Sequence, residues 1–209
     1  FGSTNELAVF EMGNGGLTEV LDPSQVLLAE RGNGAIGSVI VPVLEGNRPI
    51  LVEMQALTSR SVLPVPRRTA NGLDHNRMLM ITAVLSRNAR LNLSSQDIIA
   101  NVAGGIRISE PAADLGLALA IASSLTGLPV LPGIAVTGEI GLSGELRSVS
   151  HLDHRLNEIK RLGFSSCLLP TASVNKIALT DGIELLPAQT VREAMAISLK
   201  SADNERDGH

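Results

Sequence analysis

Two aspartates of this chain occupy positions from which side chains often do chemistry. Asp114 lies near the start of an apolar run, 112–125, that predicts a buried helix, and Asp153 lies where an amphipathic helix is expected to begin. Two carboxylates held close together could share a proton and divide acid and base roles, because each charge raises the pKa of its neighbour. The structural alternative, which we favour, is that each aspartate pairs with an arginine such as Arg107 or Arg155.

The other reactive side chains do not predict a catalytic or metal site. His75, His151, His154 and His209 lack the spacing of metal ligands. His151 and His154 are i,i+3 beside Asp153, a pattern that we interpret as a capped, solvated helix start. The single Cys167 excludes a disulfide or a cysteine zinc site within the chain, and its apolar neighbours predict a packed core residue. No Gly-Lys dipeptide occurs, so the chain has no Walker A loop with which to bind ATP.

Composition and charge limit the classes of partner. The 209 residues are 44% hydrophobic, 18% charged and 1% aromatic, with neither Trp nor Tyr, so a module that stacks bases on aromatic rings is not expected. No run of 18 or more uncharged apolar residues predicts a membrane span, and the first residues do not resemble a signal peptide. We therefore expect a cytoplasmic protein without a membrane partner.

The charge is distributed unevenly, although the net value is only -4. Residues 59–108 carry seven Arg and two acids, whereas 1–58 carry two Arg and seven acids. Arginine favours bidentate contact with phosphate. From this segment we predict five DNA-backbone contacts: Arg60, Arg67, Arg68, Arg77 and Arg90. The alternatives are a solvated surface, or pairing of Arg67 and Arg68 with acids of a neighbouring subunit. Residues 59–69, rich in Pro and Arg, are expected to form an exposed loop.

Strand and helix patterns alternate along the chain and predict an α/β fold. Strands are expected at 6–12, 35–44, 49–57, 98–108, 134–137, 167–169 and 184–186. Helices are expected at 22–32, 74–90, 112–125, 152–162, 174–179 and 191–199. We divide the chain into a connector (1–34), a main domain (35–199) and a disordered tail (200–209).

From residue 101 to 199 the sequence resembles the proteolytic domain of Lon proteases. The segments that carry the resemblance are 102–106, 125–129, 136–140, 142–144 and 168–170. The Thr137-Gly-Glu139 stretch is the most specific of them. The resemblance implies an α/β fold of the kind also seen in domain 2 of ribosomal protein S5.

A closer resemblance is to RadA (Sms) proteins, a family of bacterial DNA-repair ATPases. It rests on five segments: 1–7, 10–12, 66–74, 101–105 and 110–114. Members of this family carry a Lys-Asn-Arg-Phe-Gly motif after a RecA-like ATPase core, and Phe1 and Gly2 match its last two residues. We therefore expect the chain to start within that motif and its first residues to be a strand and connector remaining from the ATPase core.

The resemblance to Lon also predicts that the protease site is degenerate. In Lon a serine at the start of the buried helix is the nucleophile, and here 112–116 places Asp114 at that position. The catalytic lysine of Lon corresponds to Asp153 within 150–155. A Ser–Lys dyad needs a hydroxyl and an amine that can lose its proton, and carboxylates supply neither. We expect no peptidase activity, and we expect Asp114 and Asp153 to lie near each other because the two positions are in contact in Lon.

What the family implies for function is a DNA-engaging, ring-forming scaffold. RadA proteins are understood as hexameric, DNA-dependent ATPases that drive branch migration of recombination intermediates. The expected partners are single-stranded or branched DNA, other copies of the chain in a hexameric ring, and the RecA recombinase. ATP, Mg and Zn are expected as cofactors of the whole protein and none for this chain. The alternative is a pure oligomerisation or partner-docking module, with DNA bound only by the ATPase core. A hydrolase that uses Asp114 and Asp153 is a third, disfavoured hypothesis.

Overall fold

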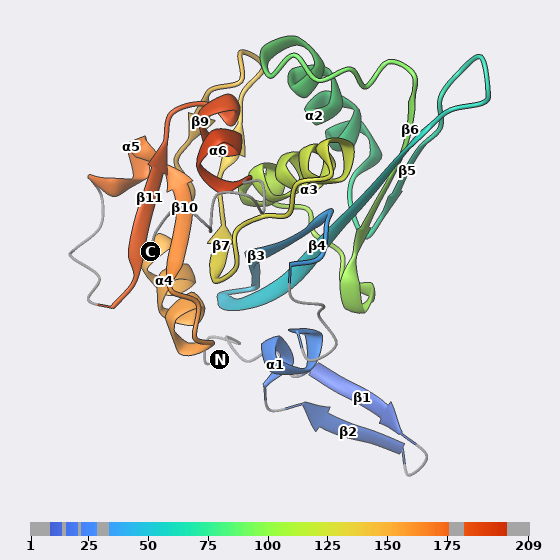
Figure 1. Cartoon of the computed structure of the whole chain (residues 1–209). Helices are drawn as coiled ribbons and strands as arrows, with labels where there is room; N and C mark the ends of the chain where they lie inside the picture. The colour runs from blue at the N-terminus through green and yellow to red at the C-terminus, as the bar shows by residue number, and fades with distance from the viewer. Residues whose placement is uncertain (1–8, 14–15, 21, 29–33, 176–181, 200–209) are drawn as a thin grey trace, which may run out of the picture.

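A seven-stranded mixed sheet forms the centre of the computed structural model (Figure 1). The structure describes residues 9–13, 16–20, 22–28, 34–175 and 182–199. In the order β11-β10-β7-β3-β4-β6-β5, the strands are β11 (Glu184–Ala188), β10 (Ser166–Pro170), β7 (Ile134–Val136), β3 (Ser38–Glu45), β4 (Arg48–Arg60), β6 (Gln96–Val102) and β5 (Arg68–Asn71). Strands β3, β4 and β6 pair antiparallel and all the other neighbours pair parallel. The predicted α/β class is confirmed.

Strands β3 and β4 form the hairpin that the sequence predicts. The register closes at Glu45 opposite Arg48, and Gly46 has a φ of 62°, which a residue without Cβ adopts at little cost. Side chains of β3 alternate between two cores: Val39, Val41 and Val43 face one core and Ile40 the other. Both faces of this strand are therefore covered.

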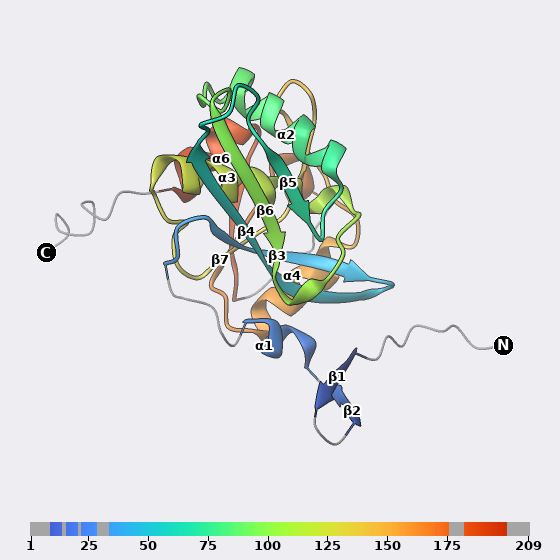
Figure 2. The ribbon, with the colours of Figure 1, turned by 90° about the vertical axis from the view of Figure 1, so that its right-hand side faces the viewer.

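Helices cover the two faces of the sheet unequally (Figures 1 and 2). The helices are α1 (Pro23–Leu28), α2 (His75–Asn88), α3 (Asp114–Thr126), α4 (Leu152–Arg161), α5 (Thr171–Val174) and α6 (Val191–Ser198). Side chains from α2, α3 and α6 enter the larger core, and side chains from α4 pack with Ile40 and Leu51 in the smaller one. Leu57 of β4 and Ile99 of β6 lie opposite each other and are 60% and 45% exposed. None of the described helices therefore covers this part of the outer face of the sheet.

Helix α3 is buried along most of its length, as its apolar sequence predicts. All residues from Asp114 to Ser123 are buried. Gly116 lets the helix approach β3 closely, because a Cβ at this position would lie 2.3 Å from Cγ2 of Val41. Pro111 begins the short 3-10 turn Pro111–Ala113, which leads directly into α3. The sequence therefore places Asp114 at the buried start of a rigid central helix.

Several predicted element boundaries differ from the observed ones. The segment 59–69 is not a loop throughout, because β4 continues to Arg60 and β5 begins at Arg68. The predicted strand 98–108 ends at Val102, where Gly104, with a φ of 75°, turns the chain. A strand at Gly16–Val20 (β2) was not predicted, and it pairs with Val9–Gly13 (β1) in a hairpin that lies apart from the main sheet (Figures 1 and 2). Residues 176–181, the tail 200–209, Phe1 and Gly2 lie outside the described residues.

Candidate functional site

Asp114 is buried and fully engaged by neighbours from two other elements. Arg77 of α2 donates from Nε to Oδ1 at 2.6 Å and from its second guanidinium nitrogen to Oδ2. The backbone N–H of Ile140, in the short strand β8 (Glu139–Ile140), donates to Oδ2 at 3.1 Å. The Asp114 side chain is 3% exposed and the Arg77 side chain 31%. Asp74 caps α2 by accepting the N–H of Arg77 at 2.8 Å, which fixes the helix turn that carries this arginine.

The electrostatics of this pair are those of a structural ion pair. Burial raises the pKa of the Asp114 carboxyl, and the hydrogen bonds from Arg77 and Ile140 offset part of that rise. The hydrogen bond to Asp114 raises the pKa of Arg77 despite desolvation of the guanidinium. Both carboxylate oxygens accept hydrogen bonds from the protein, so the fold holds Asp114 in place. The expected pairing of Asp114 with an arginine is confirmed, but the partner is Arg77 and not Arg107 or Arg155.

Arg155 instead forms a second buried pair, with Glu110. Its guanidinium is 0% exposed and donates to Glu110 Oε1 at 3.0 Å and to Oε2 at 2.5 Å. It also donates to the carbonyl oxygens of Pro42 and Ser150, at 2.6 and 3.0 Å. Glu110 Oε1 accepts the N–H of Leu44 at 2.7 Å as well. This network joins β3, the turn before α3 and the start of α4.

Asp153 has a different environment from Asp114. It is exposed in the first turn of α4. In the part of the chain that the structure describes, no hydrogen bond or ion pair joins it to Asp114 or to an arginine that both share. The expected proximity of Asp114 and Asp153 is not shown by these contacts and stays a prediction. The rings of His151 and His154 lie 5.8 Å apart beside it. Within the described ranges, no group of three or more His, Cys, Asp or Glu side chains is arranged to hold a metal ion.

The space beside the Arg77–Asp114 pair is a narrow cleft that opens into a groove. The cleft has a volume of about 20 Å³, room for about one water molecule. The adjoining groove, of about 520 Å³, is lined by eight residues, among them His75, Arg107 and Ser109. Ser109 and His75 make no hydrogen bond to each other among the described contacts, so the hydroxyl has no base to activate it.

Comparison with known proteins places this geometry in a family. The Lon protease (S16) C-terminal proteolytic domain matches residues 80–203. The chain belongs to the Lon C-terminal domain family. Within this family it is similar to DNA repair protein RadA from three bacteria. The identities are 45% with the Halalkalibacterium halodurans protein, 46% with that of Bacillus subtilis and 47% with that of Streptococcus pneumoniae.

These alignments cover most of this chain and under half of each relative. They span 95%, 95% and 93% of the chain and 44%, 43% and 46% of the respective relatives. The matches are thus those of the Lon-like, C-terminal part of RadA, and the resemblance inferred from the sequence is confirmed. No helix in the described ranges has the length and apolarity needed to cross a bilayer.

The resemblance to Lon predicts that Asp114 stands at the position of the nucleophile, and this stays a prediction. The sequence analysis did not identify Arg77 as the partner of Asp114 and assigned it to DNA. Local sequence patterns could not predict that Arg77 binds Asp114 at the start of α3, because the two residues are 37 positions apart.

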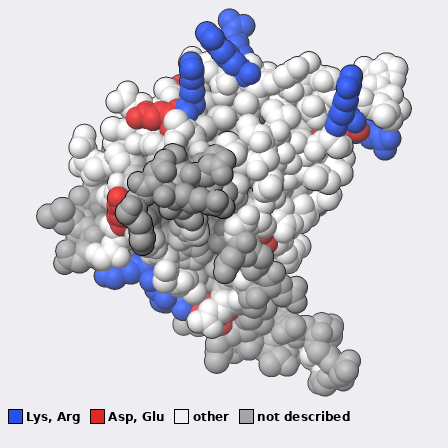
Figure 3. Space-filling view, in the orientation of Figure 1, with Lys and Arg blue, Asp and Glu red and all other residues white. Residues whose placement is uncertain are grey.

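The five arginines predicted to contact DNA fall into two groups. Arg68 donates to the carbonyl oxygens of Leu93, at 2.8 Å, and Gln96, and Arg77 is engaged by Asp114. Arg60, Arg67 and Arg90 are exposed, and no side-chain contact is described for them. On the face shown in Figure 3, basic side chains stand at separate places and do not form one continuous patch.

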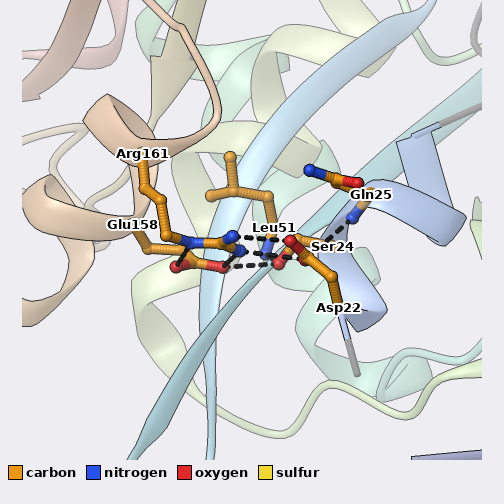
Figure 4. Close-up of polar contacts among 6 residues, drawn as sticks. All are labelled: Asp22, Ser24, Gln25, Leu51, Glu158 and Arg161. Atoms are coloured by element: carbon orange, nitrogen blue, oxygen red, sulfur yellow. Dashed lines mark hydrogen bonds and ion pairs between the residues drawn. The ribbon is translucent and has the colours of Figure 1, made fainter. Parts of the chain in front are cut away.

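A further polar network, which the sequence analysis missed, fastens α1 to α4 (Figure 4). Arg161 donates to both carboxylates of Asp22 and Glu158, at distances of 2.5 to 2.9 Å. Ser24 is 0% exposed, donates to Glu158 at 2.7 Å and accepts the N–H of Leu51 in β4 at 3.1 Å. We call these four side chains, Asp22, Ser24, Glu158 and Arg161, the α1–α4 network. It attaches the connector helix to the main domain.

Proposed function

We propose that this chain is a non-proteolytic Lon-like domain of a RadA-type DNA-repair ATPase and that it serves as a DNA-binding scaffold in a hexameric ring. The observation that carries the loss of proteolysis is Asp114, a buried carboxylate held by Arg77 where Lon has its nucleophile. Asp153, an exposed carboxylate, replaces the lysine that would act as the base. A protein built this way retains the fold while its former catalytic position stabilises the packing of α2 on α3.

The names of the relatives support a role in DNA repair. From the family we further propose branch migration of recombination intermediates by the whole protein, with ATP, Mg and Zn bound outside this chain and the RecA recombinase as a partner. The proposed place of action is the nucleoid. For the chain itself the proposed ligand is single-stranded or branched DNA.

We propose Arg60, Arg67 and Arg90 as phosphate contacts and reassign Arg68 and Arg77 to structural roles. The first three are exposed and lie in the segment with seven Arg and two acids. Few aromatic residues and many arginines favour backbone contact over base readout. Arg68 instead positions Arg67, because it fastens the start of β5 to the turn that precedes β6.

A second candidate is a pure oligomerisation or docking module, and one observation favours it. Leu57 and Ile99 lie opposite each other on β4 and β6 and are 60% and 45% exposed. Apolar side chains paired on an uncovered sheet face are typical of a contact with another protein surface.

The double variant Arg60→Ala/Arg67→Ala separates the two candidates. We expect weaker binding to DNA of any sequence and a salt slope reduced by about two, roughly one for each arginine removed. The control Arg87→Ala/Arg192→Ala removes the same charge from the exposed positions of α2 and α6. If the first variant binds DNA as the parent chain does but no longer assembles, the segment is a subunit interface and the DNA assignment is wrong.

The absence of proteolysis is tested with casein. We expect no cleavage above background by the purified chain, by Asp114→Asn or by Asp153→Asn, because neither a hydroxyl nucleophile nor an amine base stands at these positions. Cleavage that either substitution abolishes would contradict the proposal and favour a carboxylate-dependent hydrolase. Cleavage that survives both substitutions would indicate a contaminating protease.

A further inference from the structure

The loop between β4 and β5, residues 61–67, presents the most exposed apolar side chains of the described chain. Val62 is 92% exposed, Val65 77% and Leu63 41%. Pro64 and Pro66 each follow one of these residues and fix their own φ, and the chain bends at residues 63–65. The loop protrudes beyond the sheet at the upper right of Figure 1. Transfer of these apolar side chains from water into contact with a partner lowers the free energy, so the loop tip favours binding.

The base of this loop is fixed although its tip is exposed. Ser61 donates its N–H to the carbonyl of Ser95 at 2.9 Å, and Arg67 donates its N–H to Asp97 Oδ1 at 2.7 Å. The Arg68 guanidinium then binds the carbonyl oxygens of Leu93 and Gln96. A loop held in this way keeps its tip in one place, so insertion of the tip into a partner costs little additional ordering.

The charges beside the tip favour a nucleic acid as the occupant. Arg60 and Arg67 flank the apolar residues on either side and are exposed. Asp97 accepts the N–H of Arg67 at the base of the loop, and this hydrogen bond and the charges of Arg67 and Arg68 lower the pKa of its carboxyl. In the space-filling view the protruding tip is uncharged and basic side chains lie beside it (Figure 3). In a complex with DNA, the apolar side chains would contact two stacked bases, and the two flanking arginines would contact the phosphates on either side of them.

We propose that the 61–67 loop is a wedge that enters the stacked bases of DNA at a branch point, with Val62 and Val65 against the bases and Arg60 and Arg67 on the flanking phosphates. Inserting apolar side chains between bases requires the bases to unstack. At a junction between strands part of that stacking is already lost, so insertion there costs less than in continuous duplex. The loop thereby confers a preference for branched DNA. This inference rests on the proposed DNA-binding function and adds the structure of the DNA that is recognised.

The test compares binding of the whole 209-residue chain to a three-way junction and to a duplex of equal length, each with a 2-aminopurine at the same base step. We expect the wild-type chain to prefer the junction and to increase 2-aminopurine fluorescence there, because the probe unstacks. The variant Val62→Ser/Val65→Ser should lose roughly a hundredfold of that preference, about tenfold for each buried valine. Its salt slope should not change, since both arginines remain. Leu142→Ser, which removes a 72% exposed side chain elsewhere, is the matched control.

Each other outcome overturns a distinct statement. If the wild-type chain binds neither DNA, the proposed DNA-binding function fails and the wedge fails with it. If the wild-type chain binds DNA but Val62→Ser/Val65→Ser keeps the junction preference and the fluorescence change, only the wedge is wrong. If that variant binds both DNAs unchanged but sediments as a smaller species, the tip contacts another protein subunit and not DNA. Far-ultraviolet circular dichroism of the variant verifies that the fold is intact.

Discussion

Replacing Glu110 with Gln should destabilise the chain far more than the loss of a surface ion pair. Arg155 is 0% exposed and Glu110 is 22% exposed, so the substitution leaves a buried cation without its counter-charge. Removing one partner of a buried ion pair lowers the free energy of unfolding by about 3–5 kcal/mol. Because Glu110 is partly exposed, we expect a loss of about 3 kcal/mol. Gln keeps an oxygen that can accept the N–H of Leu44. The loss of stability therefore measures the contribution of the negative charge of Glu110.

The assay is urea unfolding followed by far-ultraviolet circular dichroism, because the chain has no Trp or Tyr whose fluorescence could be used. Arg155→Met should cost about 4 kcal/mol, since it also removes the donor that the buried carbonyl oxygen of Pro42 has in Arg155. The double variant should lose less than the two single losses added together, by about 2 kcal/mol. Arg147→Ala breaks an exposed pair with Glu145, whose side chains are 58% and 39% exposed, and should cost under about 0.5 kcal/mol.

Two results would refute this reasoning. A loss below about 1 kcal/mol for Glu110→Gln would show that the pair contributes no more than a surface ion pair. Additive losses in the double variant would show that the two side chains stabilise the fold independently of each other.

Two further predictions concern the connector and the cysteine. The hydrogen bond from Arg161 lowers the pKa of Asp22; burial raises that of Glu158, but the bonds from Arg161 and Ser24 outweigh it and leave it lowered. Because both folded pKa values lie below the unfolded ones, the α1–α4 network should stabilise docking of α1 above the unfolded values, near pH 4, and lose that effect as the pH falls through the folded ones. Arg161→Ala should weaken the docking of α1 at neutral pH. The amide of Leu51, which donates to Ser24, should then exchange its hydrogen faster relative to that of Val52. Unchanged exchange would contradict this prediction. Burial raises the pKa of Cys167 to about 12, so the native thiol should not react with a disulfide reagent at neutral pH until denaturant is added, and rapid labelling would mean that β10 opens locally.

Most of the architecture follows from local sequence patterns. The hairpin turn at Gly46, the uniformly apolar α3 and Pro111 in its first turn are each specified by neighbouring residues, and they agree with the structure. Strand β2 was missed because its pattern, Gly16–Val20, is short; its partner β1 precedes the turn that joins the two strands. The expectation that Asp114 and Asp153 replace the two dyad residues of Lon likewise rests on residue identity and needs no coordinates.

The tertiary structure alone decided which charges meet. Arg77 reaches Asp114 across 37 residues, Arg155 reaches Glu110 across 45, and Arg161 reaches Asp22 across 139. Nothing in the local sequence distinguishes an arginine that will be buried against a carboxylate from one that stays in water, because the choice depends on which helices pack together and how much solvent they exclude. The sequence therefore determined that this chain carries a Lon-like α/β fold. Only the tertiary structure assigned Arg68, Arg77 and Arg155 to the fold and left Arg60 and Arg67 exposed beside an apolar tip.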